Sequence, residues 1–430
     1  MGEIVRPDSQ LYWPHCDSGA QLVMGSAGSA KARDWTRLDG VDLLRALAIF
    51  FVLMNHVNIR LLIARVPYLA NVPRAMADAL VWNAQRGVQM FFAVSGFLIT
   101  STALRRWNSI SGVNVRDFYV LRFARIAPLL LLILAVLSFL HLGQVNHYVV
   151  TEKTGGLPRA ILAALTFHVN ALEARRGYLP GSWDILWSLS VEEMFYLFFP
   201  IVCYVLRTTR AFVVLMLGFV VLGPFGRTVW AHGSEIWREY SYLGSMDAIA
   251  LGCLTAILVS RRKLSLRATQ ILAIVGSAIL ILCLGLSFTS FNRALEKSGL
   301  DMSVLALGTC LVIVAAEQSR WNAPRVLHPV LNLGRRSYEI YLTHMFVVFL
   351  AFDLFLKAGK RMPGVPILFV AVILAGAALA ELVARYYSEP MNRAIRQRFS
   401  NLYRSLGSVI EAERPGEKAL PLAQAASLNN

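Results

Sequence analysis

Residues 43–63 read LLRALAIFFVLMNHVNIRLLI, and this stretch decides which kind of fold the chain adopts. A bilayer core about 30 Å thick needs about 20 mostly apolar residues in a single helix, which is the length of this run. Backbone amides and carbonyls cannot stay unpaired in lipid, and the run is too long and continuous for a barrel strand. The stretch therefore predicts a membrane-spanning α-helix.

Runs of the same kind recur along nearly the whole chain, which has 430 residues, of which 56% are hydrophobic and 16% charged. Such an apolar excess is far above that of a soluble domain. We expect an all-α, polytopic bundle of about ten transmembrane helices. The expected spans are 43–63, 86–104, 126–142, 183–206, 211–231, 241–259, 269–288, 301–317, 338–356 and 364–386.

The net charge of +16 is explained by topology rather than by binding to nucleic acid. With a cytoplasmic N-terminus, the inner segments hold about 25 Lys and Arg residues and the outer segments about 15, as the positive-inside rule requires. Both termini are then predicted to be cytoplasmic. The short apolar stretch 157–171 is re-entrant or interfacial in this topology; if it spanned, every later helix would be inverted.

Three parts of the chain differ in composition. Residues 1–37 are rich in Gly, Ala and Ser and predict a disordered cytoplasmic leader, while 393–430 predict a largely disordered cytoplasmic tail. The transmembrane domain is expected over 38–392. The five cysteines show no metal-ligand spacing, so no metal site and no disulfide framework are expected.

Two ionisable residues of the first helix, Arg45 and His56, are spaced for one helical face. Eleven residues turn the helix about 20° beyond three full turns and separate the two side chains by about 16 Å along the axis. A guanidinium holds phosphate, and an imidazole can take a proton from a hydroxyl group. The alternative is that His56 hydrogen-bonds within the bundle and Arg45 reaches toward lipid headgroups.

Two further groups of polar residues share helical faces. Arg122 and Arg125, at i and i+3, suit a diphosphate; the alternative, which the residues alone favour, is a positive-inside anchor that contacts lipid headgroups. Ser188, Glu192 and Tyr196 align at i, i+4 and i+8. The Glu192 carboxylate needs a partner, which we expect to be His56 or Arg45, and its alternative role is a structural ion pair between helices.

Five segments in order resemble the acyltransferase-3 family of membrane O-acyltransferases, which act on O-antigens, exopolysaccharides, Nod factors and macrolides. Together these segments extend over roughly residues 38–390. The segments are DLLR at 42–45 followed by His56, GVQMFFAVSGFL at 87–98, FYVLRFARIAP at 118–128, WSLSVEEMFYLFFP at 187–200 and SYEIYLTH at 337–344.

The resemblance implies an acyl-CoA co-substrate, usually acetyl-CoA, that enters from the cytoplasm, with no permanently bound cofactor. It implies that Arg45 and His56 are the essential pair and that Arg122 and Arg125 lie near the donor. Glu192 is counted with the catalytic residues on its position alone, because a carboxylate beside the imidazole would orient it or balance its charge as it takes up a proton. The acceptor is a carbohydrate or lipid-linked glycan, and the protein lies among the lipids of a bacterial inner membrane. The supporting residues are expected to be Asp42, Ser95, Gly96, Ser188, Tyr196, Tyr338 and His344.

The reaction route is left open by the resemblance. Either His56 activates the acceptor hydroxyl for direct attack on the thioester, or the acyl group first crosses the membrane. The chain is too short for the extracytoplasmic domain that larger relatives append, so transfer is expected to finish within the membrane part.

Four positions depart from the family pattern: Leu43 replaces Gly, Ser245 replaces an Arg before Asp247, Thr343 replaces Trp, and Glu389 and Pro390 are adjacent. These departures put functional roles for Asp247 and for the C-terminal motif in doubt.

A transporter or flippase for an anionic or lipid-linked glycan is the main rival, because intramembrane Arg, Glu and His suit it equally. The aromatic residues Trp82, Trp183, Trp230 and Trp237 either stack on sugars or form interfacial belts.

Overall fold

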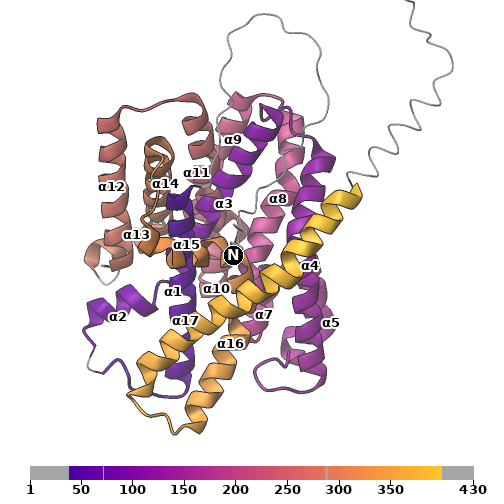
Figure 1. The fold of residues 1–430 in the computed structure, drawn as a ribbon, viewed down its shortest axis with the longest axis vertical. Helices are drawn as coiled ribbons and strands as arrows, with labels where there is room; N and C mark the ends of the chain where they lie inside the picture. The colour runs from indigo at the N-terminus through magenta and orange to yellow at the C-terminus, as the bar shows by residue number, and fades with distance from the viewer. Residues whose placement is uncertain (1–37, 71, 286–288, 400–430) are drawn as a thin grey trace, which may run out of the picture. The chain divides into compact units, whose positions relative to one another are not determined.

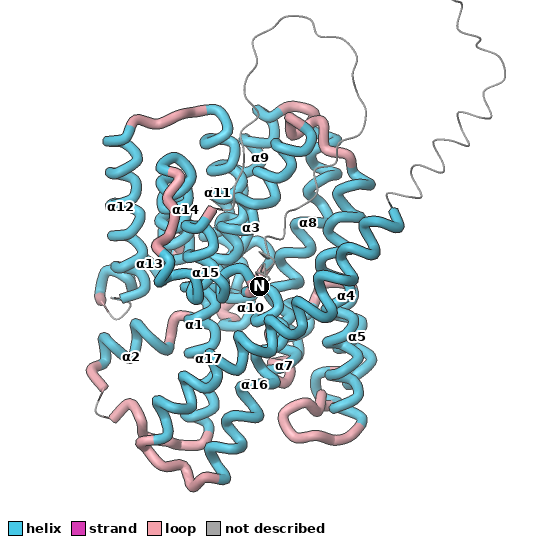
Figure 2. Tube along the Cα trace, viewed as in Figure 1, coloured by secondary structure: helices cyan, strands magenta, loops and turns pink. Residues whose placement is uncertain are grey.

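The computed structural model describes residues 38–70, 72–285 and 289–399, and every regular element within these ranges is a helix (Figure 2). The predicted leader 1–37 and most of the predicted tail lie outside the described residues. The helices in chain order (Figure 1) are α1 (Asp39–Ile63), α2 (Arg74–Val81), α3 (Ala84–Trp107), α4 (Val115–Leu142), η1 (Glu152–Thr154), α5 (Gly156–Leu165), α6 (Val169–Arg176), α7 (Gly181–Asp184), α8 (Leu186–Leu206), α9 (Thr209–Arg227), η2 (Val229–Ala231), α10 (Glu235–Tyr240), α11 (Tyr242–Arg261), α12 (Leu266–Gly285), α13 (Ser290–Ser298), α14 (Asp301–Ser319), η3 (Arg325–Leu327), α15 (His328–Arg335), α16 (Ser337–Lys357), α17 (Gly364–Val383) and the π-helical turn η4 (Ala384–Ser388).

In the described part of the chain, ten helical segments are long and apolar enough to cross a membrane, and they coincide with the ten predicted spans. The prediction of an all-α, multi-pass membrane protein is therefore confirmed. The side on which each terminus lies stays a prediction. The last of these segments continues beyond Asn392 to Phe399.

The predicted start of the third span, residue 126, is wrong as a helix boundary. Helix α4 begins at Val115, where the Asn114 side chain accepts a hydrogen bond of 3.0 Å from the Asp117 amide. An N-cap of this kind satisfies one of the four unpaired amides at a helix start. Four charged residues, Arg116, Asp117, Arg122 and Arg125, interrupt the apolar pattern in the first three turns, so these turns were left out of the predicted span.

The stretch 157–171 forms two short helices, α5 and α6, with a turn between them. Helix α5 has ten residues and is therefore about 15 Å long, half of what a bilayer core requires. The re-entrant or interfacial alternative is the one that fits this length.

Helix α1 lies at the centre of the packing and contacts α3, α14, α15, α16 and α17 (Figure 1). Its start is held by Arg335 of α15, whose Nε donates to the Asp42 carboxylate over 2.9 Å. The long helix pairs α3–α11 and α9–α11 also pack closely. These contacts fix how far α1 is rotated about its axis, and so where Arg45 and His56 point.

Candidate active site

A cavity of about 310 Å³ lies between α1, α3, α4, α8 and α16, and we call it the arginine cavity. Three guanidiniums line it, those of Arg45, Arg122 and Arg125, against two carboxylates, Glu192 and Glu193. Positive charge is therefore in excess, which suits a polyanionic ligand. Its polar lining consists of Arg45, Ser95, Thr102, Arg122, Arg125, Ser188, Glu192, Glu193, Tyr196, Ser337, Tyr338 and Tyr341.

Side chains around the arginine cavity hold the guanidiniums in place. The Arg45 guanidinium lies 3.9 Å from the carboxylate of Asp42, which in turn accepts the hydrogen bond from Arg335. The Arg122 guanidinium carbon lies 4.2 Å from the centroid of the Tyr196 ring, a cation–π arrangement. The predicted pair Arg122 and Arg125 thus shares one cavity with Arg45, although the three come from two helices far apart in sequence.

Glu192 has partners other than those expected. Its carboxylate accepts hydrogen bonds from the hydroxyl groups of Ser95 on α3 and Tyr196 on its own helix. The hydrogen bonds thus come from these two hydroxyls, while Arg45, one of the two expected partners, lies close enough for its charge to interact with that of Glu192.

A second cavity of about 470 Å³, which we call the histidine cavity, contains His56. Helices α1, α3, α7, α8, α10 and α16 form its walls. Its lining is both polar and aromatic. These lining side chains are Asn55, His56, Arg60, Gln85, Tyr178, Asp184, Trp187, Glu239, Tyr240 and Tyr341.

His344 lies beside His56, with the two ring centroids 5.0 Å apart. Its Nδ1 is 2.7 Å from the Tyr341 carbonyl oxygen, which can only accept a hydrogen bond, so Nδ1 carries a proton. His344 is fully buried, and its Nε2 has no hydrogen-bond partner among the described residues. One nitrogen beside His56 is therefore available as an acceptor in the neutral ring.

The two cavities share only part of their walls, the side chains of Val88 and Tyr341. The Tyr341 hydroxyl is held 2.6 Å from the Ser188 hydroxyl and donates to the Ile185 carbonyl over 3.0 Å. Arg45 and His56, predicted to share one helical face, therefore line two adjoining cavities with Tyr341 at the boundary. One face of α1 serves both, since about 16 Å of helix separates the two residues.

The remaining supporting residues have mainly structural contacts. Tyr338 lines the arginine cavity and donates its hydroxyl proton to the Ile126 carbonyl over 3.0 Å. Gly96 lies where α3 packs against α11.

Several lining residues of the histidine cavity were missed from the sequence, above all Asp184, Glu239 and Tyr240. Asp184 immediately precedes a long apolar helix, a costly place for a carboxylate, and that was the available signal. Trp183, proposed to stack on a sugar or lie at an interface, has no exposed surface, so it does neither in this structure. Its neighbour Trp187 lines the cavity instead.

Fold and cavities together define a class: a multi-pass membrane protein with a cationic cavity beside a cavity lined by His56, whose ring lies 5.0 Å from that of His344. A family model described as an acyltransferase domain, that of the acyltransferase-3 family, matches residues 38–381. The chain belongs to this family.

The names of curated relatives describe the same kind of activity that the sequence predicts for this chain. The chain is 22% identical over 383 residues to the O-acetyltransferase OatA of Staphylococcus aureus strain NCTC 8325 / PS 47, a match that covers 86% of this chain and 60% of OatA. The protein SACOL0978 of S. aureus strain COL, named as a candidate O-acetyltransferase, is 24% identical over 347 residues, 75% of this chain and 52% of its own. The chain thus spans somewhat more than half the length of these relatives. No solved structure gives a significant match.

Proposed function

We propose that the protein is an O-acyltransferase that moves an acyl group, acetyl in the simplest case, from acyl-CoA to a hydroxyl of a carbohydrate or lipid-linked glycan. The observation that carries the proposal is the junction at Tyr341 between the arginine cavity and the histidine cavity. A two-substrate transfer needs two adjoining sites of different chemistry. The family and the names of its relatives support the same reaction class.

Coenzyme A fits the charge of the arginine cavity. It carries a diphosphate and a further phosphate, and guanidiniums bind phosphates through paired, charge-assisted hydrogen bonds. Arg122 and Arg125 of α4 would hold phosphates, while Arg45 of α1 would direct the thioester toward Tyr341. No permanently bound cofactor takes part in this scheme.

The transfer step assigns His56 the role of general base. The acceptor hydroxyl gives its proton to His56 while its oxygen attacks the thioester carbonyl carbon, so that a C–O bond forms and the C–S bond breaks. The CoA thiolate leaves and takes up the proton. His344 would accept a hydrogen bond from the ring of His56 or orient that ring, because the two rings lie side by side.

The location follows from the same assignment. Acyl-CoA is made in the cytoplasm, so the arginine cavity would open to the cytoplasmic side of a bacterial plasma membrane and the histidine cavity toward the other side. The positive-inside distribution of the +16 charge supports this orientation. Membrane lipid is then the surrounding partner, and nucleic acid is not.

The test is CoA release by the detergent-purified protein with acetyl-CoA and a lipid-linked glycan extract. His56→Gln should lower kcat by about 100-fold or more, the usual contribution of a general base, with little change in KM for acetyl-CoA. His328→Gln is the matched control, because His328 is exposed at the start of α15.

Each outcome separates the proposal from its rival. Wild-type turnover that survives in His56→Gln would remove the role given to this histidine. The transporter alternative would be favoured if no CoA is released with several donors and acceptors and if the protein moves a glycan across the membrane of reconstituted vesicles.

A further inference from the structure

The histidine cavity has a charge pattern that the transfer chemistry does not need. Two carboxylates line it, Asp184 and Glu239, against a single guanidinium, that of Arg60. His56 must be uncharged to take a proton, a point that rests on the proposed function. The cavity is therefore lined by more carboxyl groups than guanidinium groups, the reverse of the arginine cavity beside it.

Polar atoms in this cavity lack partners. Asn55 Oδ1 and Arg60 Nε are both buried and form no hydrogen bond with any described residue, although both side chains line the cavity. One is an acceptor and the other a donor. Buried polar groups are normally satisfied, so a ligand that both donates and accepts is the natural complement. Hydroxyl groups do both.

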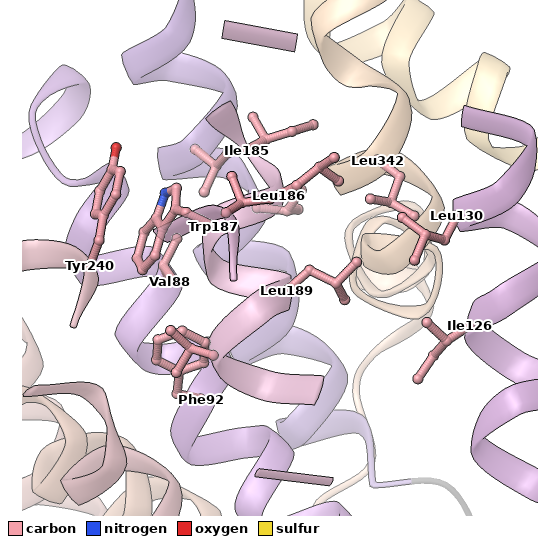
Figure 3. Close-up of a cluster of buried hydrophobic side chains, with 14 of the residues drawn as sticks. Val88, Phe92, Ile126, Leu130, Ile185, Leu186, Trp187, Leu189, Tyr240 and Leu342 are labelled. Carbon is pink, nitrogen blue, oxygen red and sulfur yellow. The ribbon is translucent and has the colours of Figure 1, made fainter. Parts of the chain in front are cut away.

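A stacked aromatic pair, which we call the Trp187–Tyr240 wall, lines the same cavity as these polar atoms. The rings of Trp187 and Tyr240 stack with centroids 4.0 Å apart and planes 4° from parallel, next to Val88 (Figure 3). The Tyr240 hydroxyl donates to Asp184 Oδ1 over 3.2 Å, which fixes the ring and places the carboxylate beside it. Only the outward face of this pair is open to the apolar C–H face of a pyranose ring, because the inward faces of the two rings cover each other.

The charge of the Arg60 guanidinium already has stabilising neighbours. Its guanidinium carbon lies 5.1 Å from the centroid of the Phe349 ring, so cation–π contact already engages it, and Asp184 lies close enough to stabilise its charge. An acidic sugar would bring a third carboxylate beside Asp184 and Glu239. Like charges brought together in a partly desolvated site oppose binding.

We propose that the histidine cavity is the acceptor site and that it selects an uncharged, hydroxyl-rich sugar ring over a uronic acid or another acidic sugar. Asp184 and Glu239 are the specificity-determining residues. Asn55 and Arg60 bind hydroxyls, and the Trp187–Tyr240 wall supports the ring face. The cavity volume of about 470 Å³ lies within the range of about 300–1,000 Å³ that small-molecule sites occupy.

The test measures binding, so it does not depend on acyl transfer. Methyl glycosides of glucose, galactose, mannose and N-acetylglucosamine, with the uronates matching the first three, are presented to the protein in nanodiscs and followed by saturation-transfer NMR. We expect signals from neutral glycosides and weak or no signals from uronates. Glu239→Gln, which keeps side-chain shape and removes one negative charge, should raise uronate binding by about five-fold or more.

Two further variants complete the design. Glu235→Gln removes the same charge from the same helix, α10, at an exposed residue that does not line the cavity, and should leave the preference unchanged. Trp187→Leu should weaken binding of the neutral glycosides.

The proposal is overturned if uronates bind the wild type as well as neutral glycosides do, if no neutral glycoside binds, or if Glu235→Gln matches the gain of Glu239→Gln. Selective binding of neutral glycosides without CoA release would instead contradict the proposed acyl transfer and leave the sugar site standing.

Discussion

The contribution of each arginine of the arginine cavity to binding of the acyl donor can be tested separately. Arg125 lines the cavity from α4 and is one of the three cations that outnumber Glu192 and Glu193. If it binds a CoA phosphate, Arg125→Gln removes a charge-assisted hydrogen bond worth roughly 1.5–3 kcal/mol. The KM for acetyl-CoA should then rise by about ten-fold or more, with a smaller change in kcat, in steady-state assays.

Arg210→Gln is the control for this variant. Arg210 is an exposed arginine near the start of α9 and lies outside both cavities, so its replacement should leave KM unchanged. Equal KM values for Arg125→Gln and the wild type would contradict a donor role for Arg125. A KM that rises steeply with salt in the wild type but not in Arg125→Gln would support it.

Asp247 illustrates how a departure from the family pattern is compensated. Ser245 stands where an arginine is expected, yet Arg227 of α9 supplies the guanidinium and donates to both Asp247 oxygens over 3.0 and 2.7 Å. Arg227 also donates to the Gly299 carbonyl over 2.9 Å. A fully buried ion pair with its remaining donors satisfied fixes α9 against α11, so the contacts of Asp247 are structural.

Two glycines between α3 and α11 determine how closely these two helices pack. A Cβ atom added at Gly96 would lie 2.0 Å from the Ile249 carbonyl oxygen, and one added at Gly252 would lie 2.0 Å from that of Ala93. Small residues allow such close approach of transmembrane helices. Ser95, the neighbour of Gly96, reaches Glu192 only because α3 is held in this position.

Gly96→Ala should therefore force α3 and α11 apart. The cost of overpacking is about 1–3 kcal/mol, and the melting temperature in detergent should fall. Gly218→Ala in α9 is the matched control, because its new Cβ meets no atom within 4 Å and the helix gains propensity. Equal melting temperatures for the two variants would show that the helices are not in the close contact described.

Ion pairs connect the C-terminal helical segment, α17 and η4 with the residues that follow, to the start of α16. Arg336 donates through Nε to Glu381 over 2.8 Å and through Nη1 to Glu389, the residue that precedes Pro390. The C-terminal motif thus has a packing contact in this structure, at the end of α16 that carries Tyr338 and Tyr341.

For the whole molecule, the clearest pH dependence of stability comes from Glu173 on α6. Burial, and then the neighbouring Asp184 carboxyl, raise the pKa of Glu173 well above its ordinary value, while the Leu179 amide opposes the shift. The charge of Arg60 acts on Asp184. A carboxyl whose pKa is raised by folding favours the folded state while it is protonated.

The sign of the effect follows from linkage. The contribution of Glu173 is fully present below the unfolded-state pKa of about 4.3 and is lost as the pH rises toward the higher folded-state pKa. The melting temperature in detergent should therefore fall as the pH is raised above about 5, and Glu173→Gln should flatten this decline. Glu152→Gln, at an exposed residue of η1, should keep the wild-type profile. Superimposable profiles for wild type and Glu173→Gln would contradict the assignment.

The sequence by itself determined the fold class and the ten spans. Each span is a local property, because about 20 apolar residues must pair their own backbone groups in lipid, wherever the other helices lie. The pairing of Arg122 with Arg125 was equally local, since i and i+3 always share a helical face. The start of α4 was missed because hydropathy records lipid contact and says nothing of a helix that continues into water.

Only the tertiary structure decided what lies opposite each of these faces. How each helix is rotated about its own axis decides which side chains meet. These rotations bring Glu192 to Ser95 and Tyr196, and they place Tyr341 between Arg45 and His56. They also bring Asp184 and Glu239 into the lining of the histidine cavity. Those rotations are set by contacts between residues far apart in sequence, such as Gly96 with Ile249 and Asp42 with Arg335. A periodic pattern gives the face of one helix, whereas a cavity is enclosed by the faces of five or six.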